Sequence, residues 1–340
     1  MKNIYATDAP QRMGPLIGIP DLLADFGVPL EKVLAGLPLG PEIFADPEQH
    51  IPYALAAKLL QDCARLSNCE HFGLILGSRC DHRSLGAPGH WMQNAPDLET
   101  ALTGFVALQR GNSRGASVYL HRYGDTVVFG YGIYERGAVA HEQAYALIAA
   151  LIFNMVQTLT GGVAQIAEVL FSFRRPSESK FYSELFGVPI RFDQPETGLV
   201  LAISALSAPI PGARPEEMKR LESLAASMAP ASHRIWTDRV RHALRPLLLR
   251  NEPTSASAAA HLSVNVRTLS RRLASEGTSF QEILDDVRYA MARELLAVTE
   301  MPIGDIAAAL SYSAHGPFID AFRRWSGAAP LVWRRAVRDA

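Results

Sequence analysis

The first two hundred residues alternate between two hydrophobic periodicities. Apolar residues three and four positions apart predict helices, and alternation of apolar with polar residues predicts strands. The helices are expected at 51–66, 98–109 and 142–159. The strands are expected at 117–123, 126–134, 169–173 and 198–203, the first two joined as a hairpin by Gly124 and Asp125. This part is therefore predicted to be a mixed α/β domain.

The pattern breaks between residues 204 and 232, where proline, alanine and serine dominate around one short helical stretch at 215–228. Beyond this boundary no strand pattern is left. Helices are expected at 234–250, 255–262, 266–275, 280–298, 303–310, 316–325 and 330–337. The expected domains are 1–205, a linker at 206–232, and an all-α domain at 233–340.

Two segments of the all-α part repeat each other. The first reads LSVNVRTLSRRLASEG from residue 262, and the second reads LSYSAHGPFIDAFRRWSG from residue 310. Each is preceded by a short small-residue helix, so each predicts a helix, a turn and a second helix. The long helix at 280–298 joins them. We expect two helix-turn-helix units, at about 255–275 and about 303–326.

Both second helices have the same internal pattern. Each has two apolar anchors four positions apart, a polar residue suited to cap its start, and a glycine at its end. The anchors are Leu269 and Leu273 in the first unit and Phe318 and Phe322 in the second; the expected caps are Asn265 and Ser313, and the glycines are Gly277 and Gly327.

The composition is that of a soluble, well-folded protein. The 340 residues suit two domains, with 48% hydrophobic and 20% charged residues. The longest apolar run, 146–156, is shorter than the ~20 residues of a membrane span and indicates a buried helix. Because the N-terminus also lacks a signal-peptide pattern, we expect a cytoplasmic protein with no membrane partner.

The charge is unevenly distributed along the chain. The formal net charge is −1, yet residues 233–340 hold fifteen arginines, no lysine and eleven acids. Arginine presents a planar fork of donors that matches phosphate oxygens and guanine edges. A basic domain behind an acidic one therefore indicates polyanion binding at the C-terminal end.

Three cysteines, without a secretion signal, argue against a disulfide framework. Two of them stand in unusual pairs with histidine: Cys69 with His71, and Cys80 with His82. Neither pair has the usual spacing of zinc ligands. We predict no metal site, although the sequence leaves open whether these four residues bind one.

Motifs of catalysis are missing from the sequence, which contains no G-x-S-x-G, P-loop or G-x-G-x-x-G. We therefore expect no enzyme and no cofactor. Aromatic and polar residues of the first domain suit a small-molecule site, although an ordinary core and a hydrated sheet face would hold the same residue types. The candidates are His90, Trp91, Tyr119, His121 and Tyr131.

The C-terminal part resembles the DNA-binding domain of the AraC/XylS family of transcription regulators. The similarity is carried by RTLSRRLASEGTSFQEILDDVRYAMARELL, then by MPIGDIAAALSYS and AFRRWSGAAP, in family order. The first domain is similar to the arabinose-binding-type effector and dimerisation domain of one branch of this family, through IPYALAAKLLQDCARL, FGLILGSRC and FSFRRPSESKFYSELFGVPIRFDQPETGLVL. The resemblance implies double-stranded DNA as the partner.

The first unit presents four polar side chains opposite its anchors, at the N-terminal half that a recognition helix inserts into the major groove. They are Arg267, Thr268, Ser270 and Arg271. The resemblance implies base or nearby phosphate contacts for Arg267, Ser270 and Arg271. Arg272 points sideways and is expected to contact phosphate or Asp286.

The second unit departs from this pattern. Its outward positions are His315, Gly316, Ile319 and Asp320, and Asp320 falls where Arg271 falls in the first unit. An acid facing phosphates is repelled unless it accepts from cytosine or pairs with Arg323 or Arg324. We expect these two arginines to contact the DNA backbone while the unit adds little sequence specificity.

The expected function is a ligand-responsive transcription regulator, an activator of a nearby operon. It is expected to form a homodimer and to contact DNA, a small-molecule effector and RNA polymerase. Two alternatives stay open: a metal-sensing or enzymatic first domain tethered to DNA, and a constitutive regulator whose first domain only dimerises.

Overall fold

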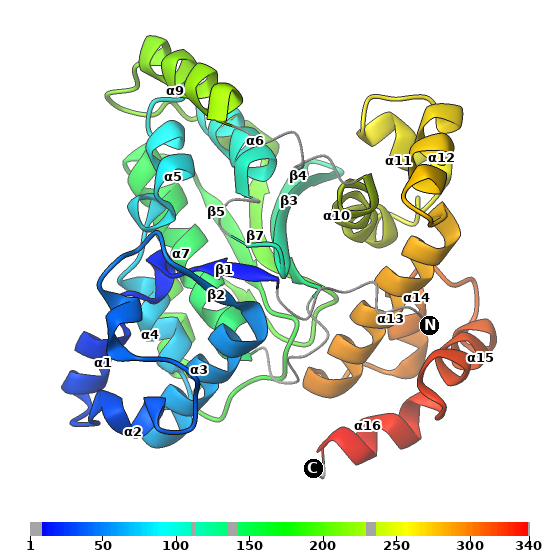
Figure 1. Cartoon of the computed structure of the whole chain (residues 1–340), viewed down its shortest axis with the longest axis horizontal. Helices are drawn as coiled ribbons and strands as arrows, with labels where there is room; N and C mark the ends of the chain where they lie inside the picture. The colour runs from blue at the N-terminus through cyan, green and yellow to red at the C-terminus, as the bar shows by residue number, and fades with distance from the viewer. Residues whose placement is uncertain (1–8, 110–112, 135–141, 229–235, 339–340) are drawn as a thin grey trace. The chain divides into compact units, whose positions relative to one another are not determined.

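The chain forms two compact units in the computed structural model, which describes residues 9–109, 113–134, 142–228 and 236–338. One unit comprises Met1–Phe192 and Glu196–Ala225, and the other comprises Asp193–Pro195 and Ala226–Ala340. The first is mixed α/β and the second is helical (Figure 1). The predicted fold class is therefore confirmed.

The first unit is built on a five-stranded sheet with strand order β3-β4-β7-β5-β6. All neighbours are antiparallel except β5 and β6, which are parallel. A separate antiparallel pair is formed by β1 and β2. The strands are β1 (Pro10–Arg12), β2 (His50–Pro52), β3 (Ala116–Tyr123), β4 (Thr126–Ile133), β5 (Ile166–Leu170), β6 (Ile190–Arg191) and β7 (Thr197–Ala202).

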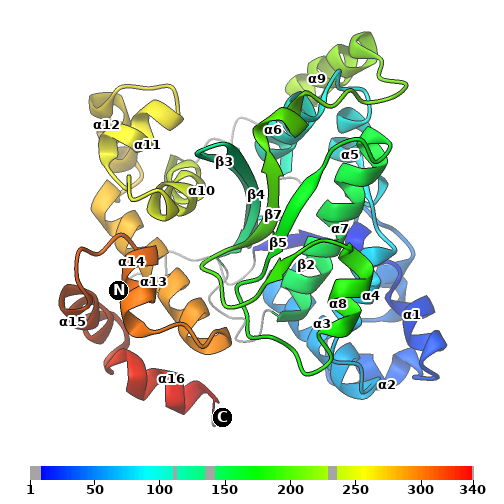
Figure 2. The same ribbon diagram turned by 180° about the vertical axis from the view of Figure 1, so that it is seen from behind.

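Helices pack against the sheet and around it (Figures 1 and 2). The core lies where α6 and α7 meet β4: the Phe105 ring is 6.3 Å from the Phe129 ring, and Tyr145 meets Tyr131 edge-on at 6.0 Å. The helices are α1 (Ile19–Asp25), α2 (Leu30–Leu34), α3 (Tyr53–Leu66), α4 (Phe72–Ser78), α5 (Ala87–Met92), α6 (Leu98–Leu108), α7 (Glu142–Thr160), α8 (Lys180–Phe186) and α9 (Pro215–Met228). Short 3₁₀ turns lie at Gly14–Leu16, Pro41–Phe44, His82–Leu85 and Ile203–Ser207.

The hairpin and the three long helices lie where the sequence predicts them, within two residues at each end. The strand expected at 169–173 is wrong in position, because β5 covers Ile166–Leu170. The apolar residues that follow it enter an aromatic cluster instead, in which Phe171 stacks on Phe192 at 5.4 Å and Phe173 lies 4.8 Å from Phe171. Several short elements, including β1, β6 and α8, were not predicted, since they span too few residues to show a period.

Two glycines allow α4 and α7 to approach closely. A Cβ at Gly73 would lie 2.1 Å from the carbonyl oxygen of Gln143, and one at Gly77 would lie 2.1 Å from that of Leu147. Because the obstacle is backbone in both cases, no side-chain movement can relieve the contact. The backbone N–H of Gly73 also donates to Oε1 of Gln143 at 2.7 Å.

Replacing Gly77 with alanine is expected to lower the free energy of unfolding by about 1–3 kcal/mol, because the added methyl group forces the two helices apart. Thermal or urea unfolding of the full chain measures it. Gly36→Ala is the matched control: it lies in the same unit, has open space around its Cβ position and should change stability by less than about 0.5 kcal/mol. Equal stability of both variants would show that the packing of α4 on α7 adapts.

The central helix α7 is long and apolar enough to resemble a membrane span. However, 72% of its most apolar window is buried inside the fold, where it packs on α3, α4 and the sheet. The interpretation of the apolar run at 146–156 as a buried core helix is thus confirmed.

The second unit consists of helices throughout its described residues. The longest, α13, buries Ile283, Leu284, Val287, Met291 and Leu295 along one face, and Ser279 with Glu282 forms a capping box at its start. The first begins at Trp236, and the predicted start at 234 lies outside the described residues. The helices are α10 (Trp236–Leu249), α11 (Ser255–His261), α12 (Val266–Ser275), α13 (Phe280–Val298), α14 (Ile303–Ala309), α15 (His315–Ser326) and α16 (Pro330–Arg338).

A buried ion pair joins α10 to α13. The guanidinium of Arg245 donates two hydrogen bonds, each 3.0 Å long, to the two carboxylate oxygens of Glu294. The side chains are 0% and 3% exposed, so water screens neither charge. The pair fixes α10, which precedes the first helix-turn-helix unit, against α13, which joins the two helix-turn-helix units.

Candidate nucleic-acid interface and interior cavity

The two helix-turn-helix units share one hydrogen-bond pattern in their turns. In the first, the N–H of Ser263 donates to Ala260 and that of Val264 donates to Ala259. In the second, Ser311 and Tyr312 donate in the same way to the carbonyls of Ala308 and Ala307. The repeat seen in the sequence is therefore a repeat of structure, with α13 between the copies (Figure 1).

The second turn is one residue longer than the first. Four residues separate α11 from α12, and five separate α14 from α15. Asn265 caps α12 as predicted, with Oδ1 accepting from the N–H of Thr268 at 2.8 Å. The prediction of Ser313 as the second cap is wrong, because the extra residue moves the cap to Ala314, which has no side-chain acceptor.

A serine occupies the left-handed position of each turn. Ser263 has φ 55° and Ser311 has φ 58°, a region that glycine enters without steric cost. Each serine therefore carries backbone strain that a glycine would not. The Ser311 hydroxyl offsets part of it by donating to the carbonyl of Leu248 at 2.7 Å.

Replacing Ser263 with glycine is expected to raise the free energy of unfolding by about 0.5–1 kcal/mol, since it removes the strain without losing a side-chain bond. Ser311→Gly should gain less, because the hydrogen bond to Leu248 is worth about 0.5–1.5 kcal/mol and is lost. Ser311→Ala keeps the strain, loses the bond and should be the least stable. Chemical denaturation of the three variants gives the order, and a stabilised Ser311→Ala protein would contradict it.

The exposed face of α12 carries two cations, Arg267 and Arg271, that have no ion-pair partner among the described residues. Arg267, Ser270 and Arg271 are exposed, while Leu269 and Leu273 are buried as predicted. Thr268 is half-buried. Within the described part of the chain, neither Arg267 nor Arg271 has a carboxylate at ion-pair distance. Both guanidinium groups are therefore available to an external anion.

Arg272 lies beside an aromatic ring. Its guanidinium carbon is 5.9 Å from the centroid of Trp236, and that of Arg239 is 4.2 Å from the same ring. Glu276, at the end of α12, accepts from the backbone N–H groups of Trp236 and Thr237. This end of the recognition helix is thus attached to the start of α10.

The exposed face of α15 differs in charge. His315, Gly316 and Asp320 are exposed and Ile319 is half-buried, so the positions equivalent to those of α12 include no cation. The two arginines of the last turns have carboxylates nearby: Arg323 is 3.8 Å from Asp320, and Arg324 is 3.7 Å from Asp285 of α13.

The five candidates for a small-molecule site are not brought together. Tyr119 and His121 face one side of the sheet, and Tyr131 faces the other, because Tyr119 pairs with Gly130 and Val118 with Tyr131. The two-residue turn already sets this register, so the separation was present in the sequence. Tyr119 and His121 both bind the buried carboxylate of Glu196, at 3.2 Å and 3.1 Å.

The other two candidates lie on α5. The ring of Trp91 is buried against α6, where it occupies the space that a Cβ at Gly104 would need. His90 is half-exposed, and its Nε2 lies 3.9 Å from Glu217 of α9, the helix predicted inside the linker. Neither residue lines the cavity described next.

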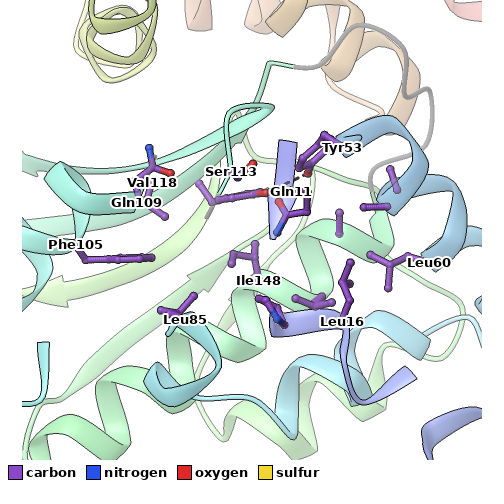
Figure 3. A pocket seen from close by; sticks show the side chains of 16 residues that line it. Gln11, Leu16, Tyr53, Leu60, Leu85, Phe105, Gln109, Ser113, Val118 and Ile148 are labelled. Atoms are coloured by element: carbon purple, nitrogen blue, oxygen red, sulfur yellow. Dashed lines mark hydrogen bonds between the residues drawn. The ribbon is translucent and has the colours of Figure 1, made fainter. Parts of the chain in front are cut away.

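A partly open cavity of about 60 Å³ lies between β3, β4, α3 and α7 (Figure 3). Of the five candidates only Tyr131 lines it, and its hydroxyl is 3.1 Å from that of Tyr53. The other polar lining residues, Gln11, Gln109 and Ser113, were not predicted, because Gln11 lies about a hundred residues before the other two in the chain. Only the folded arrangement of these segments defines the site.

The cysteine and histidine pairs do not form a metal site. Among the described residues, no group of three or more His, Cys, Asp or Glu side chains could hold a metal ion. His71 stacks on Phe181 at 3.9 Å, and the thiol of Cys80 lies 3.6 Å from the carbonyl oxygen of Pro15. Burial raises the pKa of both Cys69 and Cys80, which disfavours the thiolate that a metal needs.

Two family descriptions match the chain. "Arabinose-binding domain of AraC transcription regulator, N-term" matches residues 27–210, more than half of the chain, and "Helix-turn-helix domain" matches residues 258–336. The chain belongs to the AraC family of transcription regulators. AraC-type proteins regulate transcription and are not enzymes, which confirms the predicted class.

Relatives within the AraC family match along nearly the whole chain. The ornithine utilization regulator of Pseudomonas aeruginosa is 27% identical over 321 residues, which cover 93% of this chain and 94% of that protein. The HTH-type transcriptional regulator VirS of Mycobacterium tuberculosis is 26% identical over 330 residues, covering 94% of each. The crystal structure of CdpR from Pseudomonas aeruginosa has a TM-score of 0.47 at 23% identity and covers 98% of this chain and 100% of that one.

Proposed function

We propose that this AraC-type regulator activates transcription of a nearby operon in response to a small-molecule effector. We also propose that the two helix-turn-helix units contact DNA in different ways. The helix α12 reads bases through Arg267, Ser270 and Arg271, assisted by Thr268 and Arg272. The helix α15 contacts backbone phosphates through Arg323 and Arg324, while His315, Ile319 and Asp320 contribute little specificity.

The contrast in charge between the two helices carries this proposal. The exposed guanidinium groups of Arg267 and Arg271 have no carboxylate partner in the part of the chain that the structure describes, so binding DNA breaks no ion pair seen there. Arg323 and Arg324 each lie within 4 Å of a carboxylate. At the position equivalent to Arg271, the acid Asp320 cannot donate to guanine and repels phosphate.

We propose the effector response for the mixed α/β unit, because this unit holds the cavity described above. N-terminal domains of this family commonly bind effectors and dimerise. We propose a homodimer, action on DNA in the cytoplasm, and contact with RNA polymerase as the route to activation. The name of one relative refers to ornithine, yet none of the described residues that line the cavity is charged, so we do not propose ornithine as the effector of this chain.

Footprinting of the full chain on its own upstream DNA tests the proposal. We expect a protected site with two parts, in which base substitutions under α12 weaken binding strongly and those under α15 weaken it little. Equal sensitivity of both parts would contradict the division of work. Transcription with RNA polymerase from the same fragment should increase when the regulator is added, and a decrease would indicate a repressor.

A further inference from the structure

We infer that the cavity binds a compact, uncharged and largely apolar molecule that carries one hydrogen-bonding group, such as a hydroxyl or carbonyl. This inference rests on the effector-responsive function proposed above and names the ligand class of that same site.

No described residue that lines the cavity carries a charge. The described lining side chains are aliphatic, aromatic or neutral and polar: Gln11, Pro15, Leu16, Tyr53, Ala56, Ala57, Leu60, Leu85, Phe105, Gln109, Ser113, Val118, Tyr131, Ala144, Leu147 and Ile148. A carboxylate or ammonium group entering this space would lose its hydration and meet no counter-ion among these residues. A sugar would bring more hydroxyl groups than the few polar side chains can pair.

One side of the cavity holds an unused hydrogen-bonding group. The hydroxyl of Ser113 is buried and has no partner among the described residues, and the residue is only 6% exposed. The nearby amide of Gln109 is buried and makes no side-chain hydrogen bond within the described chain. Buried polar groups are normally paired, so an unpaired hydroxyl facing a cavity indicates a missing partner.

The polar lining side chains lie along one side of the cavity. Figure 3 shows Gln109, Ser113 and Gln11 along that side together with Val118, and Leu85, Ile148 and Leu16 along the other. The hydroxyls of Tyr53 and Tyr131 already pair with each other at 3.1 Å. A bound molecule would therefore direct its single polar group to Ser113 and Gln109 and its apolar body toward Leu16 and Ile148.

The volume limits the size of the molecule. The cavity measures about 60 Å³, less than half of the roughly 150 Å³ of an engineered cavity that accepts benzene. Without movement of its lining, the site accepts molecules smaller than benzene. Short alcohols and ketones match both the size and the polarity.

A series of probes that differ only in charge tests the inference. We would measure binding of ethanol, acetone, acetate and ethylamine to the full chain by saturation-transfer NMR, with glycerol as a small polyol. The neutral pair should bind saturably, and the charged pair and glycerol at least about tenfold more weakly. Equal binding of acetate or ethylamine, or no saturable binding of the neutral probes, would overturn the inference.

Two serines provide a matched pair of variants. Ser113→Ala should weaken binding of the neutral probes about three- to tenfold, the worth of one hydrogen bond. Ser117→Ala is the control, because the Ser117 hydroxyl is also buried and has no partner among the described residues, but Ser117 does not line the cavity. Ala144→Val, which fills the cavity from α7, should abolish binding. Unchanged binding in Ser113→Ala would overturn the assignment of the polar group.

Footprinting with the same preparation separates the two proposals. If the protein protects its DNA site but binds no neutral probe, only the inference about the cavity fails. If it binds no specific DNA, the proposed function fails whatever the probes do.

Discussion

Replacing Arg271 with alanine is expected to weaken binding to the specific DNA site by about 1–3 kcal/mol, or about five- to 150-fold. The reason is that Arg271 lies on the exposed face of α12 with a guanidinium group that no carboxylate of the described chain neutralises. Arg267→Ala should have a similar effect. Titration of the full chain against a labelled specific duplex and a scrambled duplex measures both the affinity and the specificity.

Asp320→Ala is the matched control on α15, at the position equivalent to Arg271. It removes an exposed acid that lies 3.8 Å from Arg323, so affinity should stay the same or rise slightly. Stability should not change, because exposed ion pairs contribute little. If Asp320→Ala lost as much affinity as Arg271→Ala, the second helix would read bases and our division of work would be wrong.

Replacing Glu294 with leucine is expected to destabilise the helical unit by about 3–5 kcal/mol, because the guanidinium of Arg245 stays buried without its carboxylate. Arg245 is 0% exposed, so it cannot recover solvation by a small shift. Urea denaturation followed by circular dichroism measures the loss. The transition of the helical unit should move while that of the α/β unit stays in place.

The double variant Arg245→Met with Glu294→Leu is the control for this prediction. It fills similar space without charge, and the stability should return to within about 1–2 kcal/mol of the original chain. A double variant as unstable as the single one would show that the charges themselves, rather than the cost of leaving one unpaired, hold α10 against α13.

The helical unit was predictable because its signals are local. Leu269 with Leu273, and Phe318 with Phe322, repeat one spacing in two places, and both pairs are buried. The cap at Ser313 was missed because the second turn is one residue longer, which a helical period does not reveal. The pair of Arg245 and Glu294 was missed because charged residues 49 positions apart look like ordinary surface residues in a sequence.

The small-molecule site was hardly predictable. Aromatic residues of one hairpin suggested a shared pocket, yet successive residues of a strand face opposite sides of a sheet, so Tyr131 points away from Tyr119. Ser113 offers no sequence signal at all, since its significance depends on being buried without a partner. Of the five candidates only Tyr131 lines the cavity. The other lining residues come from segments that only folding brings together.

The pairing of Arg245 with Glu294 has a further consequence for how the protein responds to ionic strength. Mobile ions screen charges that water reaches and hardly affect those buried in a dry interior. The exposed arginines of α12 belong to the first kind, and the buried pair belongs to the second. Concentrated salt should therefore release the protein from DNA while its helical unit stays folded. Loss of DNA binding at high salt can thus be distinguished from unfolding.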